Sequence, residues 1–189
     1  MMTNNSKEKV RQLQNKLYLT AKKCSNRRFH ALYDKVYRDD VLYEAWKRVK
    51  ANQGSSGVDG ITIEDIEASG VNRYLTGIQS ELTSGTYRPL PVRRVMIPKP
   101  DGSQRPLGIP CVKDRIVQMA TKIAIEPVFE ADFKDCSYGF RPKRSAKQAL
   151  EVVRKACNNK GYYVVDADIE KFFDNVNQDK LMALMELRI

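Results

Sequence analysis

The run YYVVDADIEKFFDNV, residues 162–176, constrains the fold of this sequence more than any other stretch. Its first half is rich in β-branched and aromatic residues, which predicts a buried β-strand. Because alternate side chains of a strand share a face, the carboxylates of Asp166 and Asp168 should point the same way. An ionised carboxylate among apolar side chains is strongly destabilising unless a cation or hydrogen-bond donors meet it. The pattern therefore predicts positive charge beside this strand.

Two kinds of chemistry are open to these carboxylates. Asp166 and Asp168 would lie about 7 Å apart on one strand face, and nothing in the sequence separates their environments as a hydrolytic acid–base pair requires. A hard divalent cation such as Mg²⁺ is a better partner, because it takes carboxylate and phosphate oxygens together and so links the acids to nucleotide chemistry. The alternative is that both carboxylates lie at the strand end and meet only water or a helix N-terminus.

The positive charge of the chain is concentrated at its N-terminus. Residues 1–50 hold 13 Lys and Arg against 5 Asp and Glu, whereas the net charge of the whole chain is +10. Such asymmetry favours a nucleic acid or an anionic membrane surface as partner, and the alternative is a solvated basic helix face. No apolar run approaches the roughly 20 residues of a membrane span, and the N-terminus lacks a secretory signal, so we expect a cytoplasmic protein.

Hydrophobic spacing predicts helices before and after one β-hairpin. Spacings of three and four predict a helix over 7–24, a second helix from about Asp39 to the GSSGVDG loop, and shorter helices over 63–68 and 71–84. The turn PDGS predicts a hairpin with strands at 92–99 and 104–109. A three-residue loop at 101–103 would place Lys99 opposite Arg105, whereas a two-residue loop would put them on opposite faces.

Three more helices are expected towards the C-terminus. A helix over 112–133 should be kinked or ended by Pro127. A capping box of Ser145 and Gln148 predicts the next helix. The last helix should begin near Asn177, with Leu181, Leu184 and Met185 pointing inward. This is an α+β pattern whose core strand needs partners to form a sheet.

Five segments of the sequence resemble motifs of one protein family and occur in the same order as in that family. DIEKFF, residues 168–173, resembles the first catalytic motif of reverse transcriptases, and its surroundings resemble the version in group II intron reverse transcriptases, also called intron maturases. RRVMIPKPDGSQRPLGIP is similar to the fingers motif of that family, DRIVQMA and EPVFE to its next helix, and YGFRPKRSAKQAL to the segment before the palm. LYDKVYRDDVLYEAWKRVKANQGSSGVDGIT resembles its N-terminal extension and first block.

The resemblance implies the N-terminal part of a right-hand polymerase of the α+β class, with fingers helices, a β-hairpin and an incomplete palm sheet. Residues 1–50 would be a basic helical N-terminal extension, residues 51–160 the fingers, and residues 161–189 the start of the palm. The implied activity is that of an RNA-directed DNA polymerase, which uses Mg²⁺, deoxynucleoside triphosphates, an RNA template and a DNA primer, and which also assists intron splicing.

The resemblance also assigns roles to single residues. Asp168 matches the metal-binding aspartate of the family, and the carbonyl of Ile169 matches the backbone ligand of the second metal. Phe173 matches the aromatic residue beneath the incoming sugar. Lys99 and Arg105 match the pair that grips the triphosphate, which suits a lysine point charge and a bidentate arginine. The alternatives are that Lys99 and Arg105 are ordinary surface charges of a hairpin, and that one of the neighbouring phenylalanines lies in the core.

Basic residues at two further places are candidates for RNA contact. They are Lys16, Lys22, Lys23, Arg27 and Arg28 in the N-terminal extension and Arg141, Lys143 and Arg144 before a helix N-terminus. The alternatives are that the N-terminal helix packs on another domain and that the trio caps a loop. For Asp166, a role behind the metal ligands or in solvent is favoured because the motif begins at Asp168.

One part of the family pattern is absent from the sequence. The other metal-binding aspartates of reverse transcriptases come from a Tyr-Ala-Asp-Asp-like turn, and these 189 residues contain no such run. We therefore expect an incomplete two-metal site and a chain that does not polymerise by itself. The alternative function is a non-catalytic module for RNA binding or splicing assistance. An unfinished sheet edge would also allow a dimer.

Overall fold

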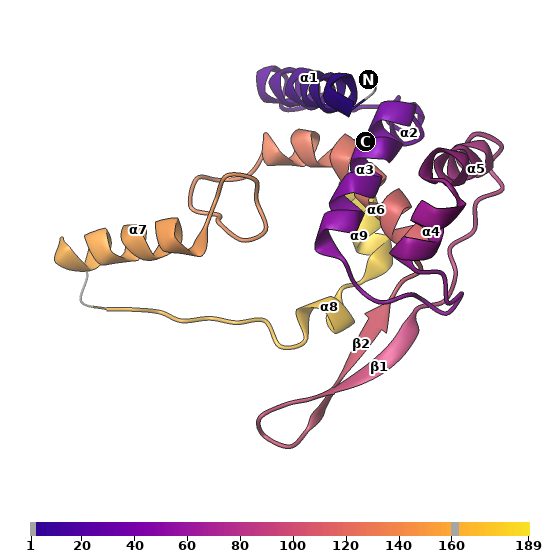
Figure 1. Cartoon of the computed structure of the whole chain (residues 1–189). Helices are drawn as coiled ribbons and strands as arrows, with labels where there is room; N and C mark the ends of the chain where they lie inside the picture. Colours follow the sequence, from indigo (N-terminus) through magenta and orange to yellow (C-terminus); the bar gives the residue numbers. More distant parts are fainter. Residues whose placement is uncertain (1–2, 160–162) are drawn as a thin grey trace.

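The computed structural model of the chain describes residues 3–159 and 163–189 (Figure 1). This part consists of helices and one two-stranded antiparallel sheet, which confirms the α+β class. Within it, no helix is both long and apolar enough to cross a membrane. The elements are α1 (Thr3–Lys23), α2 (Tyr33–Val36), α3 (Asp39–Asn52), α4 (Ile63–Ser69), α5 (Val71–Thr83), β1 (Arg93–Pro98), β2 (Gln104–Ile109), α6 (Val112–Glu130), α7 (Ala146–Asn158), α8 (Phe172–Asn175) and α9 (Gln178–Met185).

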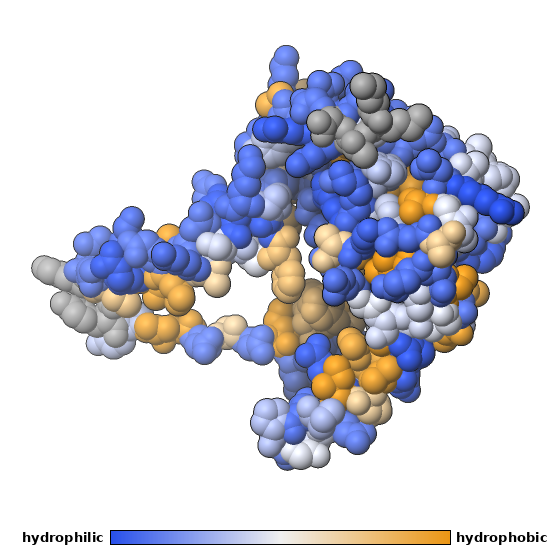
Figure 2. Space-filling view, viewed as in Figure 1, coloured by the Kyte–Doolittle hydropathy of each residue, from blue (hydrophilic) through white to orange (hydrophobic). Residues whose placement is uncertain are grey.

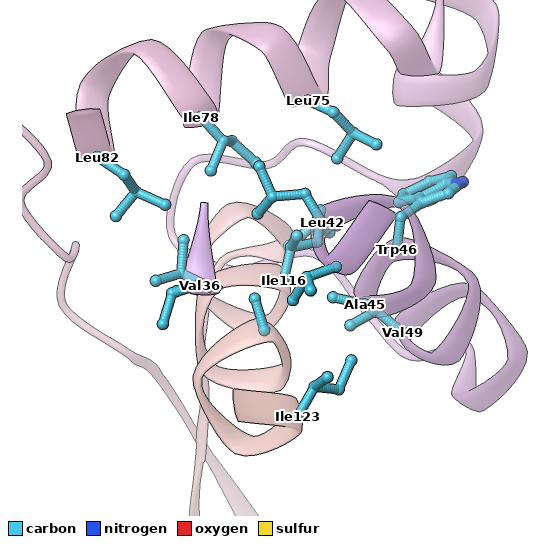
Figure 3. Close-up of a cluster of buried hydrophobic side chains, with 14 of the residues drawn as sticks. Val36, Leu42, Ala45, Trp46, Val49, Leu75, Ile78, Leu82, Ile116 and Ile123 are labelled. Carbon is cyan, nitrogen blue, oxygen red and sulfur yellow. The ribbon is translucent and has the colours of Figure 1, made fainter. Parts of the chain in front are cut away.

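The main core lies where α3 packs against α5 on one side and α6 on another (Figure 3), and α1 packs against α3 and α6. Leu42 of α3, Ile78 of α5 and Ile116 of α6 are almost completely buried there. Burying a side chain of this size stabilises the fold by roughly 1.5–3 kcal/mol. The spacing of apolar residues that predicted these helices is the spacing that places them on one face, so the predictions for α3, α4 and α5 are confirmed to within a residue or two at their ends.

Helix α1 closes the core through the narrow apolar stripe that the sequence predicted. Val10, Leu17 and Ala21 are buried on this stripe, against α3 and α6. The remaining surface of the helix carries its lysines and arginines into solvent. A basic helix is therefore held to the body by a few aliphatic side chains.

Pro127 lies inside α6 and does not end it, since the helix continues to Glu130. A proline lacks the N–H that would bond the carbonyl four residues earlier, so the carbonyl of Ile123 loses its usual helical partner. The side-chain amide of Gln14, from α1, donates a hydrogen bond of 3.1 Å to this carbonyl. The prediction that Pro127 might end the helix is wrong because a neighbouring helix satisfies the carbonyl and packing covers the proline.

The hairpin has the predicted strands but a different turn. Lys99 N–H donates to Ser103 O at 2.8 Å and Gly102 N–H donates to Lys99 O at 3.0 Å, so the loop consists of residues 100–102. Arg105 is paired with Ile97. The prediction that a three-residue loop sets Lys99 opposite Arg105 is therefore wrong. The loop forms one residue earlier because Asp101 accepts hydrogen bonds from the backbone and hydroxyl of Ser103.

The expected strand over 162–169 does not form in the part of it that the structure describes. Residues 163–169 are extended but lack a paired neighbour, and Figure 1 shows them running alone from α7 to α8. Tyr163 is 97% and Val165 94% exposed, although the sequence predicted a buried strand. β-Branched residues favour a strand only where partner strands bond their backbone. Tyr162 and the expected boundary between fingers and palm lie outside the described residues.

Apolar residues in α7 and α9 are also uncovered. The capping box of α7 is confirmed, with Ser145 and Gln148 bonding each other's backbone N–H. Leu181 and Leu184 of α9, expected to point inward, are 46% and 63% exposed, and only Met185 of the expected trio is half-buried. In Figure 2, hydrophobic residues line the lower side of α7 and the segment that follows it. Amphipathic spacing identified a face of α9, but nothing described packs against most of it.

A buried carboxylate joins the segment before the hairpin to α6. Asp114 is 3% exposed and accepts hydrogen bonds from the Tyr87 hydroxyl at 2.6 Å and from the Leu90 N–H at 3.1 Å. It lies in the first turn of α6, where the helix dipole favours a negative charge. Burial and the hydrogen bond to Asp114 raise the pKa of Tyr87, so its hydroxyl stays a proton donor. Asp114 thereby fixes the chain that leads into β1.

A second set of contacts ties the base of the hairpin to the loop after α3. Arg93 Nε donates to Ser56 O at 3.0 Å, and Arg115 Nη2 donates to Ser55 O at 2.6 Å. A Cβ atom at Gly57 would lie 2.6 Å from the backbone of Cys111. Only glycine allows this close approach. Gly57 therefore serves close packing against Cys111, whereas Gly54 and Gly60 of the same loop have the positive φ values.

We expect Gln14→Ala to destabilise the fold. The substitution leaves the Ile123 carbonyl without its donor in a partly buried place, which should lower the free energy of unfolding by about 1–2 kcal/mol. Urea denaturation followed by circular dichroism measures this change. Gln12→Ala is the matched control, because Gln12 is an exposed glutamine of the same helix. Equal stability of the two variants would contradict the role given to Gln14.

We expect Asp114→Ala to be more damaging, by roughly 2–4 kcal/mol, because it leaves two donors unpaired at a buried site. Hydrogen exchange should also report faster exchange at the Leu90 amide and at the base of the hairpin. Asp179→Ala removes an exposed aspartate of α9 and serves as control. Unchanged exchange at Leu90 would show that Asp114 does not hold this segment.

Candidate nucleotide and RNA-binding site

The hairpin presents the two residues expected to bind the triphosphate on one face. Arg105 pairs with Ile97, and Lys99 follows Ile97 by two residues, so Lys99 and Arg105 lie diagonally on the same side of the ribbon. The register differs from the expected one by two residues, and a shift of two preserves the face. Both side chains are exposed, and neither forms an ion pair with any residue in 3–159 or 163–189. Two uncompensated cations on one face are suited to an anion.

The DIEKFF motif lies on the exposed segment and the short helix α8. Asp168 and Ile169 are exposed, and so is Asp166, the residue for which a solvent role was favoured. Phe172 and Phe173 are 49% and 86% exposed and contact each other edge to face, with ring centroids 5.3 Å apart. The expectation that one of these rings lies in the core is wrong for the described residues, because no described element covers them.

The described residues do not form a metal site. Among residues 3–159 and 163–189, no three His, Cys, Asp or Glu side chains lie close enough to hold an ion. Mg²⁺ takes six ligands in near-octahedral geometry and is usually bound through one or two carboxylates together with water and phosphate oxygens. Asp168 alone therefore does not make up a magnesium site.

The N-terminal candidates for RNA contact differ in whether their side chains already contact other groups of the protein. All five are exposed, but Lys22 donates to Ala131 O at 3.1 Å and Arg28 to Ile189 O at 3.3 Å. The Arg27 guanidinium lies 5.5 Å from the centroid of the Phe29 ring. Lys16 and Lys23 have no such contact with the described part of the chain. These two offer the least restricted charges on α1.

In the loop before α7, the Arg141 guanidinium is bonded to other groups of the protein. Arg141 forms a bidentate pair with Glu130 at 2.7 and 3.1 Å and donates to the carbonyls of Lys134 and Ser137, and its side chain is 5% exposed. This geometry favours the alternative that Arg141 caps the loop. Sequence reasoning missed Glu130, since it lies eleven positions before Arg141 and no local pattern joins them.

The rest of the basic trio is more accessible. Arg144 contacts Asp135 at 3.2 Å and lies over the Tyr138 ring. Lys143 is exposed, has a positive φ of 61°, and forms no ion pair with the described residues. Of the three candidates, Lys143 is therefore the one whose charge the loop does not use.

Similarity to known proteins points to one family. Residues 97–187 match the family described as reverse transcriptase (RNA-dependent DNA polymerase). Protein YkfC of Escherichia coli (strain K12) is 37% identical over 186 residues, which cover 95% of this chain and 49% of that protein. Group II intron-encoded protein LtrA of Lactococcus lactis subsp. cremoris is 36% identical over 162 residues, covering 85% of this chain and 26% of that protein.

A shorter match extends to a plant protein. Nuclear intron maturase 1, mitochondrial, of Arabidopsis thaliana is 32% identical over 78 residues, which cover 41% of this chain and 11% of that protein. The chain spans about half the length of YkfC and about a quarter of LtrA. Together with the ordered motifs, these matches support a reverse transcriptase of the group II intron-encoded and intron maturase type.

Proposed function

We propose that this chain provides the fingers and the opening of the palm of a cytoplasmic RNA-directed DNA polymerase of the group II intron maturase type. The observation that carries the proposal is the pair Lys99 and Arg105, which lie without ion-pair partners among the described residues, on one face of the hairpin and within the segment that matches the family. Lysine supplies a point charge and arginine a bidentate fork, which together suit the oxygens of a triphosphate.

The base of the hairpin supports this role. Asp114 holds the segment before β1 to α6, and Arg93 holds β1 to the loop after α3, so the tip projects from a fixed base. A binding pair is more effective when its support is ordered before the ligand arrives, since less entropy is lost on binding. The ligand proposed for Lys99 and Arg105 is a deoxynucleoside triphosphate, with an RNA template and a DNA primer as the other partners.

Asp168, the Ile169 carbonyl and Phe173 are proposed to act only when further carboxylates complete the metal site. A hard dication needs several oxygen ligands, and the described residues offer no group of three acidic, His or Cys side chains around Asp168 that could hold one. We therefore propose that the 189-residue chain binds RNA but does not extend a primer alone. The dimer through a sheet edge stays a prediction.

The second candidate function is an RNA-binding module without catalysis. It is favoured by the free charges of α1, of which Lys16 and Lys23 are examples, on a helix whose apolar stripe is already covered by the body. Cations with no protein partner can contact phosphates without breaking internal bonds. The two functions differ in one property, which is nucleotide addition.

The test is a paired assay of the 189-residue chain, with primer extension on an RNA template in Mg²⁺ and deoxynucleotides, and RNA binding over a series of salt concentrations. We expect binding without extension. Neutralising Lys16, Lys22, Lys23, Arg27 and Arg28 to Gln should reduce the salt slope by about 0.7 for each phosphate that the variant no longer neutralises.

The control for this test is Lys155→Gln with Lys180→Gln, which removes exposed charges of α7 and α9. A slope that falls equally per charge in this control would mean that the N-terminal residues make no specific contact. Primer extension that disappears in Asp168→Asn would contradict the proposal that the chain alone is inactive. Absence of RNA binding at low salt would overturn both candidate functions.

A further inference from the structure

A hollow of about 790 Å³ lies between the C-terminal half of α3 and the junction of α4 and α5. We call it the α3–α5 groove and define it by Tyr43, Lys47, Lys50, Asn72 and Arg73. Its volume is within the range of roughly 300–1,000 Å³ that is typical of ligand clefts. No motif of the sequence drew attention to it, because its residues come from two helices more than twenty positions apart.

The groove carries positive charge that the protein does not neutralise. Arg73 is exposed and forms no ion pair with the described residues. Lys47 is exposed, and its Nζ lies 5.9 Å from the ring centroid of Tyr43. Lys50 is paired with Glu67, which is the one acidic side chain among the described residues that line the groove. Lys47 and Arg73 therefore leave two free positive charges on opposite helices of one hollow.

The amino end of α5 adds hydrogen-bond donors to the same place. Gly70, Val71, Asn72 and Arg73 line the groove, and the N-cap residue Gly70 offers no side chain to the first turn of this 13-residue helix. The backbone N–H groups of a first turn have no partner within the helix. They complement the side-chain cations, because an anion in the groove can accept from both.

We propose that the α3–α5 groove binds the phosphate backbone of single-stranded RNA, an inference that rests on the proposed function of RNA binding. The groove offers hydrogen-bond donors from Lys47, Arg73, the Asn72 side chain and the first N–H groups of α5. Few acceptors face them, so the groove is suited to a ligand with several negative charges. A basic groove with an aromatic side chain in its wall, here Tyr43, is suited to a single strand. Binding there is independent of base sequence, because phosphates carry no sequence information.

The groove can be tested in the whole chain with a 5′-labelled single-stranded RNA of mixed sequence. The variant Lys47→Gln with Arg73→Gln removes the two free charges, and Lys155→Gln with Lys180→Gln removes two exposed charges elsewhere. We expect the groove variant to lower the salt slope by about 1.4, which is two contacts at about 0.7 each, and to weaken binding alike for unrelated RNA sequences. The control should keep the parental slope.

Photocrosslinking with thiouridine-containing RNA gives a second readout that does not depend on stability. Crosslinked peptides should include residues from 43–53 or 67–74. RNA binding by the parent chain with no difference between groove variant and control, and with no crosslink in these peptides, would overturn the groove alone. A parent chain that binds no RNA would overturn the proposed function and the groove together. Circular dichroism of both variants should match the parent, since all four positions are exposed.

Discussion

The packing of α6 between α1 and α3 is the contact on which the other parts of the chain depend. Its residues Ile116, Ala120 and Ile123 are fully buried, so α6 is the element that turns separate amphipathic helices into one core. The amino end of the same helix holds the chain before the hairpin through Asp114 and the loop after α3 through Arg115. A single helix thus supplies both the apolar core and the polar anchors that position the candidate nucleotide-binding hairpin.

The sequence predicted the parts of the fold that depend on residues close to one another along the chain. The stripe of α1 and the capping box of α7 each depend on residues within a few positions of one another. The turn signal around Asp101 located the hairpin, but the loop forms one residue earlier than predicted. Asp114 could be placed near a helix start, but its partners Tyr87 and Leu90 are set by tertiary packing. The strand over 162–169 failed as a prediction for the opposite reason, since its propensity is strong but backbone pairing needs strands that lie beside it.

The candidate site shows the same division. The family resemblance selected Lys99, Arg105 and Asp168. The structure places Lys99 and Arg105 on one face of the hairpin, whereas Asp168 lies on an exposed segment that pairs with no described strand. Arg141 was chosen for its charge, yet its guanidinium is occupied by Glu130. Charge in a sequence identifies what a residue can bind, whereas the other charges near it in space decide whether it is free to do so.

Pro127 has a consequence for how two helices recognise each other. Most carbonyls of a helix are already bonded, so they give a neighbouring helix nothing with which to choose one axial position over another. The proline creates a single acceptor on the flank of α6, and Gln14 is the residue of α1 whose amide meets it. Sliding α1 by one turn would keep much of its apolar contact but remove this match. The carbonyl that Pro127 leaves unpaired in α6 therefore favours one axial position of α1.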